Sequence, residues 1–137
     1  MTREEYENYL QFFNERDYDA VLDFWTPEFQ VIVQGEVLFD SPETLKKGYA
    51  FLHDHVSEEV LVDHYLSDGD KIFMEARVRI KAFKTITEEV VSEAGINGIM
   101  PIEAGEEYDI PQYIHYHLKD GKFKLAVCVV VGPPRPI

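Results

Sequence analysis

The stretch YDIPQYIHYHLKDGKFKLAVCVVV, residues 108–131, decides the fold because it predicts two long antiparallel strands joined by a tight turn. Its centre, Asp120-Gly121, supplies the two residues that tolerate the positive φ angles of a type I′ turn. Pairing Lys119 with Lys122 sets the register and predicts one apolar face: Leu118 opposite Phe123, Tyr116 opposite Leu125, and Ile114 opposite Val127. Because side chains alternate between faces, the other face carries Tyr113, His115, His117, Lys124, Ala126, Cys128 and Val130. We predict that the first face packs in the core and that the second lines a pocket.

The composition is that of a globular chain. With 137 residues, 45% of them hydrophobic, we expect one domain spanning residues 1–137. The formal net charge of -13 argues against binding to a phosphate backbone, so nucleic acid is not an expected partner. Cys128 is the only cysteine, which excludes an intrachain disulfide and favours a reducing compartment. No segment has the pattern of an export signal or a membrane span, and we therefore expect a cytoplasmic protein.

Helical and strand patterns follow one another in the N-terminal part of the chain. A Thr-x-x-Glu capping box predicts a first helix over Thr2–Asn14. A short second helix, capped by Asp17 or Asp19, ends before Pro27, because the residue before a proline avoids the helical conformation. The pattern then predicts strands at Glu28–Gln34 and Val37–Phe39 and a third helix from Ser41 to about His55.

Residues Glu58–Phe83 change to a period of two and predict two more strands, joined across the Asp-Gly-Asp sequence at 68–70. The connection leaves two registers open. A three-residue loop with the glycine in a bulge places His64 beside Met74, whereas a two-residue turn places it beside Phe73. We favour the first register because it pairs apolar residues with each other.

The segment Thr85–Glu107 mixes β-branched residues, glycines and carboxylates. It predicts either a strand extension followed by a loop or a lid over a cavity mouth. Helices followed by long hairpins together predict an α+β fold, with the N-terminal helices packed in the concave face of a curved, mostly antiparallel sheet.

Several short motifs, taken in order, resemble a known superfamily. They are Phe13-Asn14-Glu15-Arg16-Asp17-Tyr18-Asp19-Ala20-Val21, Thr26-Pro27-Glu28-Phe29, Asp68-Gly69-Asp70-Lys71-Ile72 and Asp120-Gly121-Lys122-Phe123. Their order resembles the nuclear transport factor 2-like superfamily, in particular the SnoaL-like polyketide cyclases with their relatives ketosteroid isomerase and scytalone dehydratase. The resemblance covers nearly the whole chain. It implies a cone-like fold whose open end holds a small apolar ligand, and a homodimer formed through the outer face of the sheet.

The resemblance transfers some functional positions and not others. Tyr9 matches the first-helix tyrosine that donates a hydrogen bond in ketosteroid isomerase. The two acidic residues of that isomerase fall near Val33 and Tyr113, so its proton-abstracting carboxylate is not matched. Ala126 and Cys128 stand where the last strand of SnoaL-like cyclases usually carries a histidine and an aspartate.

His64 is the histidine that the resemblance favours for catalysis. It lies in Asp63-His64-Tyr65-Leu66, which resembles the segment that carries a catalytic histidine in scytalone dehydratase. The carboxylate and tyrosine of that dehydratase are replaced near Gln11 and Val33, so the identical reaction is not expected.

These observations lead to a functional hypothesis. We expect a cofactor-independent cyclase, isomerase or dehydratase that acts by general acid/base catalysis on a small apolar intermediate, polyketide-like or terpenoid-like. His64 is the expected acid/base, because the pKa of histidine lies near the working pH, and Tyr9, Tyr113 and His115 are expected to converge with it in one pocket. The residues expected to contact substrate are Phe13, Trp25, Val33, Tyr49, Met74, Ala126, Cys128 and Val130.

Other interpretations remain open. The missing acids near Val33, Ala126 and Cys128 favour a non-catalytic module that binds a hydrophobic ligand or only dimerises. His115 and His117 share a face as metal ligands can, yet no further ligand can be named, so we expect no metal. His53 and His55 are interpreted as histidines that favour the C-terminal dipole of their helix.

Overall fold

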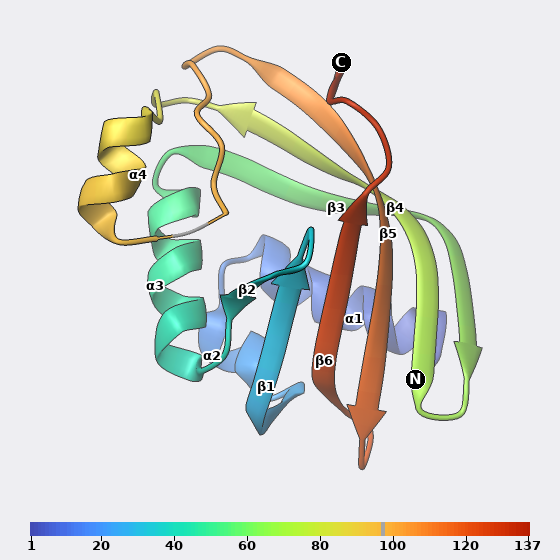
Figure 1. Ribbon diagram of the computed structural model, residues 1–137. Helices are drawn as coiled ribbons and strands as arrows, with labels where there is room; N and C mark the ends of the chain where they lie inside the picture. Colours follow the sequence, from blue (N-terminus) through green and yellow to red (C-terminus); the bar gives the residue numbers. More distant parts are fainter. Residues whose placement is uncertain (97) are drawn as a thin grey trace.

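The computed structural model describes residues 1–96 and 98–137, which form one curved, open sheet with helices along its concave side (Figure 1). The helices are α1 (Arg3–Asn14), α2 (Tyr18–Leu22), α3 (Pro42–His53) and α4 (Glu88–Ala94). The strands are β1 (Trp25–Val33), β2 (Glu36–Phe39), β3 (Val56–Asp68), β4 (Lys71–Ala82), β5 (Glu107–Lys119), β6 (Lys122–Val130) and β7 (Arg135–Pro136). Their order is β2-β1-β6-β5-β4-β3, and β7 pairs with β5. β1 and β6 run parallel, while the other neighbours run antiparallel. The predicted α+β, cone-like class is confirmed.

Local capping explains where the two long helices begin. Thr2 and Glu5 form the predicted capping box of α1, in which each side chain bonds the other residue's backbone N–H. Ser41 and Thr44 form an equivalent box at α3, whose first residue is a proline. Asp17, one of the two predicted caps, begins α2 by accepting from the backbone N–H of Ala20.

The core lies between the helices and the concave face of the sheet, and it is rich in aromatic rings. Tyr6 and Phe13 of α1 pack against Trp25 of β1 and Phe123 of β6 in one buried cluster. A second, smaller cluster joins the far ends of β3 and β4 to Ile86, which precedes α4. The segment Thr85–Glu107 therefore contributes a short helix, and a bridge between Ile86 and Ile102, beside that end of the sheet.

A β-bulge between β5 and β6 overturns part of the predicted register. The turn pairs Lys119 with Lys122 and Leu118 with Phe123 as expected, but the pairing shifts at the exposed Lys124. Beyond this extra residue Tyr116 pairs with Ala126, not Leu125. The concave face consequently carries Ile114, Tyr116, Ala126 and Cys128, and the outer face carries Tyr113, His115, His117, Leu125, Val127 and Val129.

A second bulge, at Asp63 in β3, moves His64 to the outer face. Asp68 pairs with Lys71 across a two-residue turn, so neither of the two registers considered for the hairpin is correct throughout. Val62 lies beside Ala76, as the favoured register requires, but His64 pairs with Glu75 and is exposed. The predicted pairing of His64 with Met74 is wrong, because the bulge reverses the alternation of faces.

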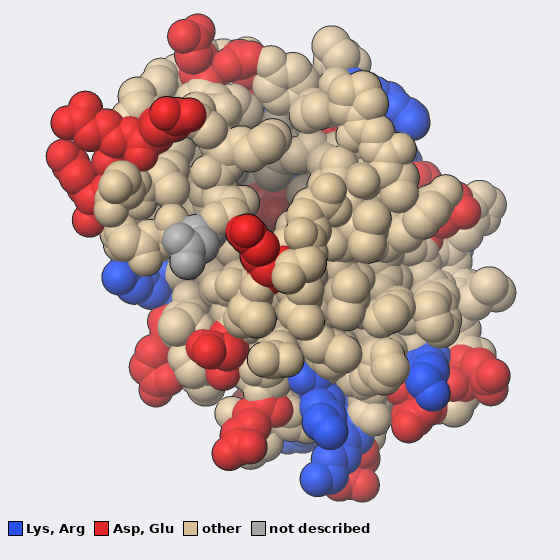
Figure 2. Space-filling model, viewed as in Figure 1, with Lys and Arg blue, Asp and Glu red and all other residues tan. Residues whose placement is uncertain are grey.

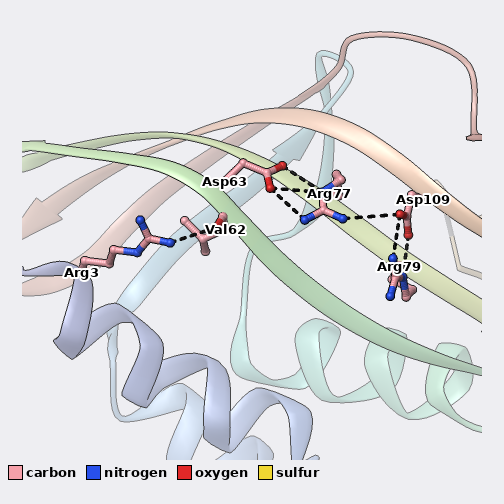
Figure 3. A network of polar contacts seen from close by, with 6 residues as sticks. All are labelled: Arg3, Val62, Asp63, Arg77, Arg79 and Asp109. Carbon is pink, nitrogen blue, oxygen red and sulfur yellow. Dashed lines mark hydrogen bonds and ion pairs between the residues drawn. The ribbon is translucent and has the colours of Figure 1, made fainter.

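Ion pairs on the outer face hold the bulged residue in place. Asp63 accepts three hydrogen bonds of 2.8 to 3.2 Å from the guanidinium of Arg77 (Figure 3). Arg79 binds Asp109 of β5 with two more, at 2.8 and 3.0 Å (Figure 3). Hydrogen bonds from the arginines hold the pKa of both carboxyl groups below the ordinary value. These residues therefore join β3, β4 and β5 on the side away from the helices.

Among the described residues, no helix is long and apolar enough to cross a membrane.

Candidate functional site

A chain of three hydrogen-bonded side chains crosses the concave side of the protein. Tyr18 opens α2, His53 closes α3, and Glu58 is the third residue of β3. The Tyr18 hydroxyl lies 2.7 Å from Nδ1 of His53, and Nε2 of His53 lies 2.8 Å from Oε1 of Glu58. The His53 side chain is 3% exposed and that of Glu58 14% exposed. Buried ionisable groups arranged in this way are typical of catalytic sites.

The hydrogen-bonding capacity of each group indicates where the protons lie along the Tyr18–His53–Glu58 chain. An ionised Glu58 can only accept, so Nε2 of His53 carries the proton between them. With that tautomer Nδ1 is free to accept from the Tyr18 hydroxyl, which also donates to the carbonyl oxygen of Tyr49 at 3.4 Å. The ring of His53 is stacked at 6° on Tyr49 and at 13° on Tyr18. The stack holds the imidazole in the plane that both hydrogen bonds need.

Glu58 belongs to the concave face of the sheet, because it pairs across the ladder with the buried Ile80. The charge of Glu58 affects side chains in the interior. Burial first, and then the charge of Glu58, raise the pKa of the Cys128 thiol to about 12. The same two causes, in the same order, raise the pKa of Tyr49 well above its ordinary value. In the space-filling view the molecule is hollowed beside the α4 segment, and an acidic side chain lies deep in the hollow (Figure 2).

Neutral tyrosine hydroxyls surround the same interior. Tyr6 and Tyr116 share a hydrogen bond of 2.6 Å, and burial raises the pKa of both well above the ordinary value. Tyr9 is 5% exposed and accepts a 3.2 Å hydrogen bond from the indole N–H of Trp25. Burial also raises the pKa of Tyr9, so its hydroxyl stays protonated and can donate.

The structure divides the four residues predicted to act together between two faces of the sheet. Tyr9 lies in the concave core, as the resemblance implies. His64, Tyr113 and His115 line a different pocket of about 400 Å³ on the outer face, where Tyr113 is 53% exposed. The predicted convergence is wrong because the bulge at Asp63 turns His64 outward, while Tyr113 and His115 lie on the face of β5 opposite the buried Ile114 and Tyr116. The bulge at Lys124 moves Ala126 and Cys128 to the concave face instead. Whether any of the four residues acts in catalysis stays a prediction.

The residues predicted to contact substrate are placed mainly on the concave side. Phe13, Trp25, Met74 and Ala126 are buried in the main core cluster, and Val33, Tyr49 and Cys128 are partly buried against it. Val130 is half-buried at the end of β6, opposite Gln112. Their contact with a substrate stays a prediction.

His53 and Glu58 were not among the predicted site residues, although the sequence contains signals for both. His53 follows Leu45 and Tyr49 at spacings of four, which places all three on one helix face. Glu58 stands two residues before Val60, at a concave-face position of an alternating strand. The interpretation of His53 as a residue that mainly favours the helix dipole is incomplete, since its ring is buried and bonded at both nitrogens.

Across residues 1–96 and 98–137, no group of three or more His, Cys, Asp or Glu side chains is placed to hold a metal ion. His115 and His117 lie close together, with ring centroids 5.0 Å apart, but have no third ligand of these types there.

Solved structures share the fold at low sequence identity. An NTF2-like protein from Burkholderia pseudomallei superposes with a TM-score of 0.69 at 12% identity, covering 96% of this chain and 92% of its own. A putative polyketide cyclase from Xanthomonas campestris gives 0.67 at 18%, covering 90% and 84%. An epoxide hydrolase from M. tuberculosis gives 0.66 at 13%, covering 91% and 78%. The fold is thus one that enzymes use.

No curated protein sequence matches the chain, whereas a family model does. That model describes the SnoaL-like domain and matches residues 6–126, which is most of the chain. By this match the chain belongs to the SnoaL-like domain family.

Proposed function

We propose that this chain is a cofactor-independent enzyme of the cyclase, isomerase or dehydratase type, acting by proton transfer on a small, apolar, polyketide-like or terpenoid-like intermediate. The observation that carries the proposal is the hydrogen-bonded Tyr18–His53–Glu58 chain, centred on the buried His53, which presents a carboxylate on the concave face. Membership of the SnoaL-like family and the presence of enzymes among the structural neighbours support it.

In this proposal Glu58 is the general acid/base. A carboxylate beside an apolar substrate takes a proton from a carbon next to a carbonyl and returns it to another atom. His53 holds Glu58 through Nε2–H and stops the carboxylate from rotating. Tyr9, whose oxygen already accepts from Trp25, donates its own hydrogen to the carbonyl oxygen as negative charge develops there.

The test uses a cyclic β,γ-unsaturated ketone, whose isomerisation to the conjugated ketone is followed by ultraviolet absorbance. We expect Glu58→Gln to lower kcat/KM by about 10²- to 10⁴-fold, the usual contribution of a positioned general acid or base. Glu59→Gln is the matched control, because Glu59 is the neighbouring carboxylate and is exposed. Equal rates for Glu58→Gln and the unmodified protein would exclude Glu58 as the base.

A second candidate function, self-association, is favoured by the outer face of the sheet. Phe73, Tyr113 and Val129 are large apolar side chains that stay 45% to 53% exposed around the outer pocket. Exposed apolar patches of this kind typically mark interaction sites. We propose that two copies of the chain pair through this face, whether or not the concave site is catalytic.

A further inference from the structure

β3 forms one edge of the sheet, and part of its backbone faces away from β4. It is the last strand in the order, so only one of its sides is paired. The N–H of Phe83 donates to the carbonyl oxygen of His55 at 3.0 Å, so the odd-numbered residues of this stretch are those that bond β4. The pairing continues without a bulge as far as Val62. The even-numbered residues up to Val62, Val60 among them, therefore turn both N–H and C=O toward the open edge.

A groove of about 450 Å³ lies between this edge and α1, and we call it the edge groove. Residues 60–62 of β3 and Leu10 of α1 line it together with four exposed polar side chains of α1: Glu7, Gln11, Asn14 and Glu15. Within residues 1–96 and 98–137, no backbone group outside the sheet bonds Val60. Backbone groups left open along a strand edge are a template for pairing with another extended chain.

Arg3 shows which kind of side chain fits between the edge and α1. Its Nη2 donates to the carbonyl oxygen of Val62 at 3.0 Å (Figure 3), and its Nε donates to Oε1 of Glu7 at 3.1 Å. One guanidinium thus joins an edge carbonyl to a carboxylate of the helix. Arg3 belongs to the first turn of α1, so it serves only one end of the edge groove.

The other end of the edge groove carries a carboxylate without such a cation. Glu15 accepts a 3.4 Å hydrogen bond from the side-chain amide of Gln11. It forms no ion pair within 4.0 Å with the basic side chains of residues 1–96 and 98–137. A positively charged side chain of a partner can therefore make at Glu15 the contact that Arg3 makes at Glu7.

The helix and the strand that line the edge groove have matching repeats. Arg3, near the start of α1, reaches Val62 of β3. Phe13, near the end of α1, packs against His53, which bonds the earlier strand residue Glu58. Because α1 and β3 run in opposite directions here, ~6 Å between helix residues four apart matches ~6.7 Å between strand residues two apart. Helix positions 7, 11 and 15 therefore advance in step with the edge-facing strand positions 62, 60 and 58.

We propose that the edge groove binds an extended basic segment of a partner protein, which joins the sheet as a further strand beside β3. The backbone of the segment bonds the open N–H and C=O of Val60. Lysine or arginine side chains at every second position point to α1 and bind Glu7 and Glu15, because side chains alternate along a strand. The net charge of -13 attracts such a segment. None of these residues belongs to the Tyr18–His53–Glu58 chain, so the inference does not depend on the proposed catalytic function.

The first measurement uses an acetylated and amidated peptide of about seven residues, in which lysine alternates with valine. The peptide is added at low salt to ¹⁵N-labelled protein, and binding is followed through the assigned amide signals in NMR spectra. We expect the amide of Val60 to shift, with nuclear Overhauser effects between the peptide backbone and Val60. Shifts confined to α1, with no such effects at Val60, would exclude strand addition.

Backbone methylation of the same peptide separates strand addition from simple charge attraction. One methylated peptide lacks the N–H groups on the edge that faces β3, and its matched control lacks those on the opposite edge. We expect the first to bind about tenfold or more weakly, since it loses several hydrogen bonds, and the control to bind like the unmodified peptide. Equal binding by the two methylated peptides would reduce the site to charge attraction and overturn the proposal.

Substitutions in α1 test which carboxylates contact the lysines. Glu7→Gln and Glu15→Gln are each expected to weaken binding of the alternating peptide by ~2- to 5-fold, as for exposed ion pairs. Glu4→Gln is the matched control, because Glu4 is an exposed carboxylate of α1 outside the edge groove, and it should leave the affinity unchanged. An equal loss in all three variants would mean that only the net charge attracts the peptide.

A second copy of the chain is the alternative occupant of the open edge. Two copies paired edge to edge bring the carboxylates of both α1 helices together, which opposes that arrangement. We expect the peptide to leave the sedimentation coefficient of the chain that of an unchanged oligomer, because the outer pocket is lined by other residues. A peptide that dissociates the chain into monomers would identify the second copy as the occupant and overturn the proposal.

Discussion

At the scale of single residues, burial determines which hydrogen-bond partners a side chain in the concave site needs and whether it is protonated. His53 is the only buried member of the charged and strongly polar residue types among residues 1–96 and 98–137. A buried imidazole is tolerated only when both nitrogens have partners, and Tyr18 and Glu58 provide them. Cys128 illustrates the opposite case, since burial raises the pKa of its thiol to about 12 and so leaves it protonated and unreactive near neutral pH.

Arg16, which follows the C-cap of α1 with a left-handed φ of 60°, provides a prediction about stability at this scale. Replacing it by glycine removes a left-handed strain of ~1–2 kcal/mol and sacrifices a cation–dipole interaction of ~0.3–1 kcal/mol. We expect Arg16→Gly to raise the free energy of unfolding by up to about 1 kcal/mol, measured by urea denaturation. Arg16→Ala keeps the strain and loses the cation, so it should be less stable than the unmodified protein. An Arg16→Gly variant less stable than Arg16→Ala would show that φ is not a source of strain.

At the scale of elements, the contact between α3 and β2 depends on a missing side chain. Gly48 lies in the middle of α3, where glycine normally weakens a helix by ~1 kcal/mol relative to alanine. A Cβ built at Gly48 would overlap the ring of Phe39, with Cζ of that ring only 2.7 Å away. The glycine therefore lets the helix approach the strand closely.

This close approach predicts that Gly48→Ala destabilises the protein despite its better helix propensity. Overpacking typically costs ~1–3 kcal/mol, so after the gain in propensity we expect a net loss of about 1–2 kcal/mol, measured by urea or thermal unfolding. The control is Lys47→Ala at the neighbouring exposed position, which should change stability by less than about 0.5 kcal/mol. Combining Gly48→Ala with Phe39→Leu should recover part of the loss. A Gly48→Ala variant as stable as Lys47→Ala would contradict this account.

At the scale of the whole molecule, the sheet has two faces of different character. The concave face packs against the helices. The outer face carries the apolar outer pocket, here called the outer groove, and the paired Arg77–Asp63 and Arg79–Asp109 side chains. The net charge of -13 opposes association of two copies at a distance. Burial of the outer groove favours association, and salt screens the repulsion between the two copies.

The proposed homodimer makes a prediction at this scale. Phe73→Glu places a charge in the outer groove and is expected to convert the protein to a monomer in sedimentation velocity at moderate salt. Its matched control is Phe83→Glu, because Phe83 is also exposed, at 56%, but lies outside the groove. Both variants should retain the circular dichroism of the folded chain. The dimer through this face is excluded if Phe83→Glu dissociates the protein as well as Phe73→Glu does, or if the unmodified protein sediments as a monomer.

Much of the fold could be predicted from local patterns. The capping residues of α1 and α3, the Asp120-Gly121 turn and the alternation along the strands are determined within a few residues. The order of motifs was enough to identify the family and the class of fold. Local physics also placed Phe13 in the core, since helical periodicity puts it on the buried stripe of α1. Trp25 is buried as expected, but as the first residue of β1 and not as part of the second helix.

The face on which a strand residue lies is not a local property. A single bulged residue reverses the alternation, and whether one forms depends on what the strand packs against and which partners stabilise it. Asp63 is held by Arg77, and the pairing shift at Lys124 puts Ala126 and Cys128 into the core, so packing on both sides of the sheet decided the register. For this reason the sequence by itself determined the family, the elements other than α4 and β7, and most of the core. Only the tertiary structure turned His64 to the outer face, put Ala126 and Cys128 on the concave face, and brought His53 to Glu58.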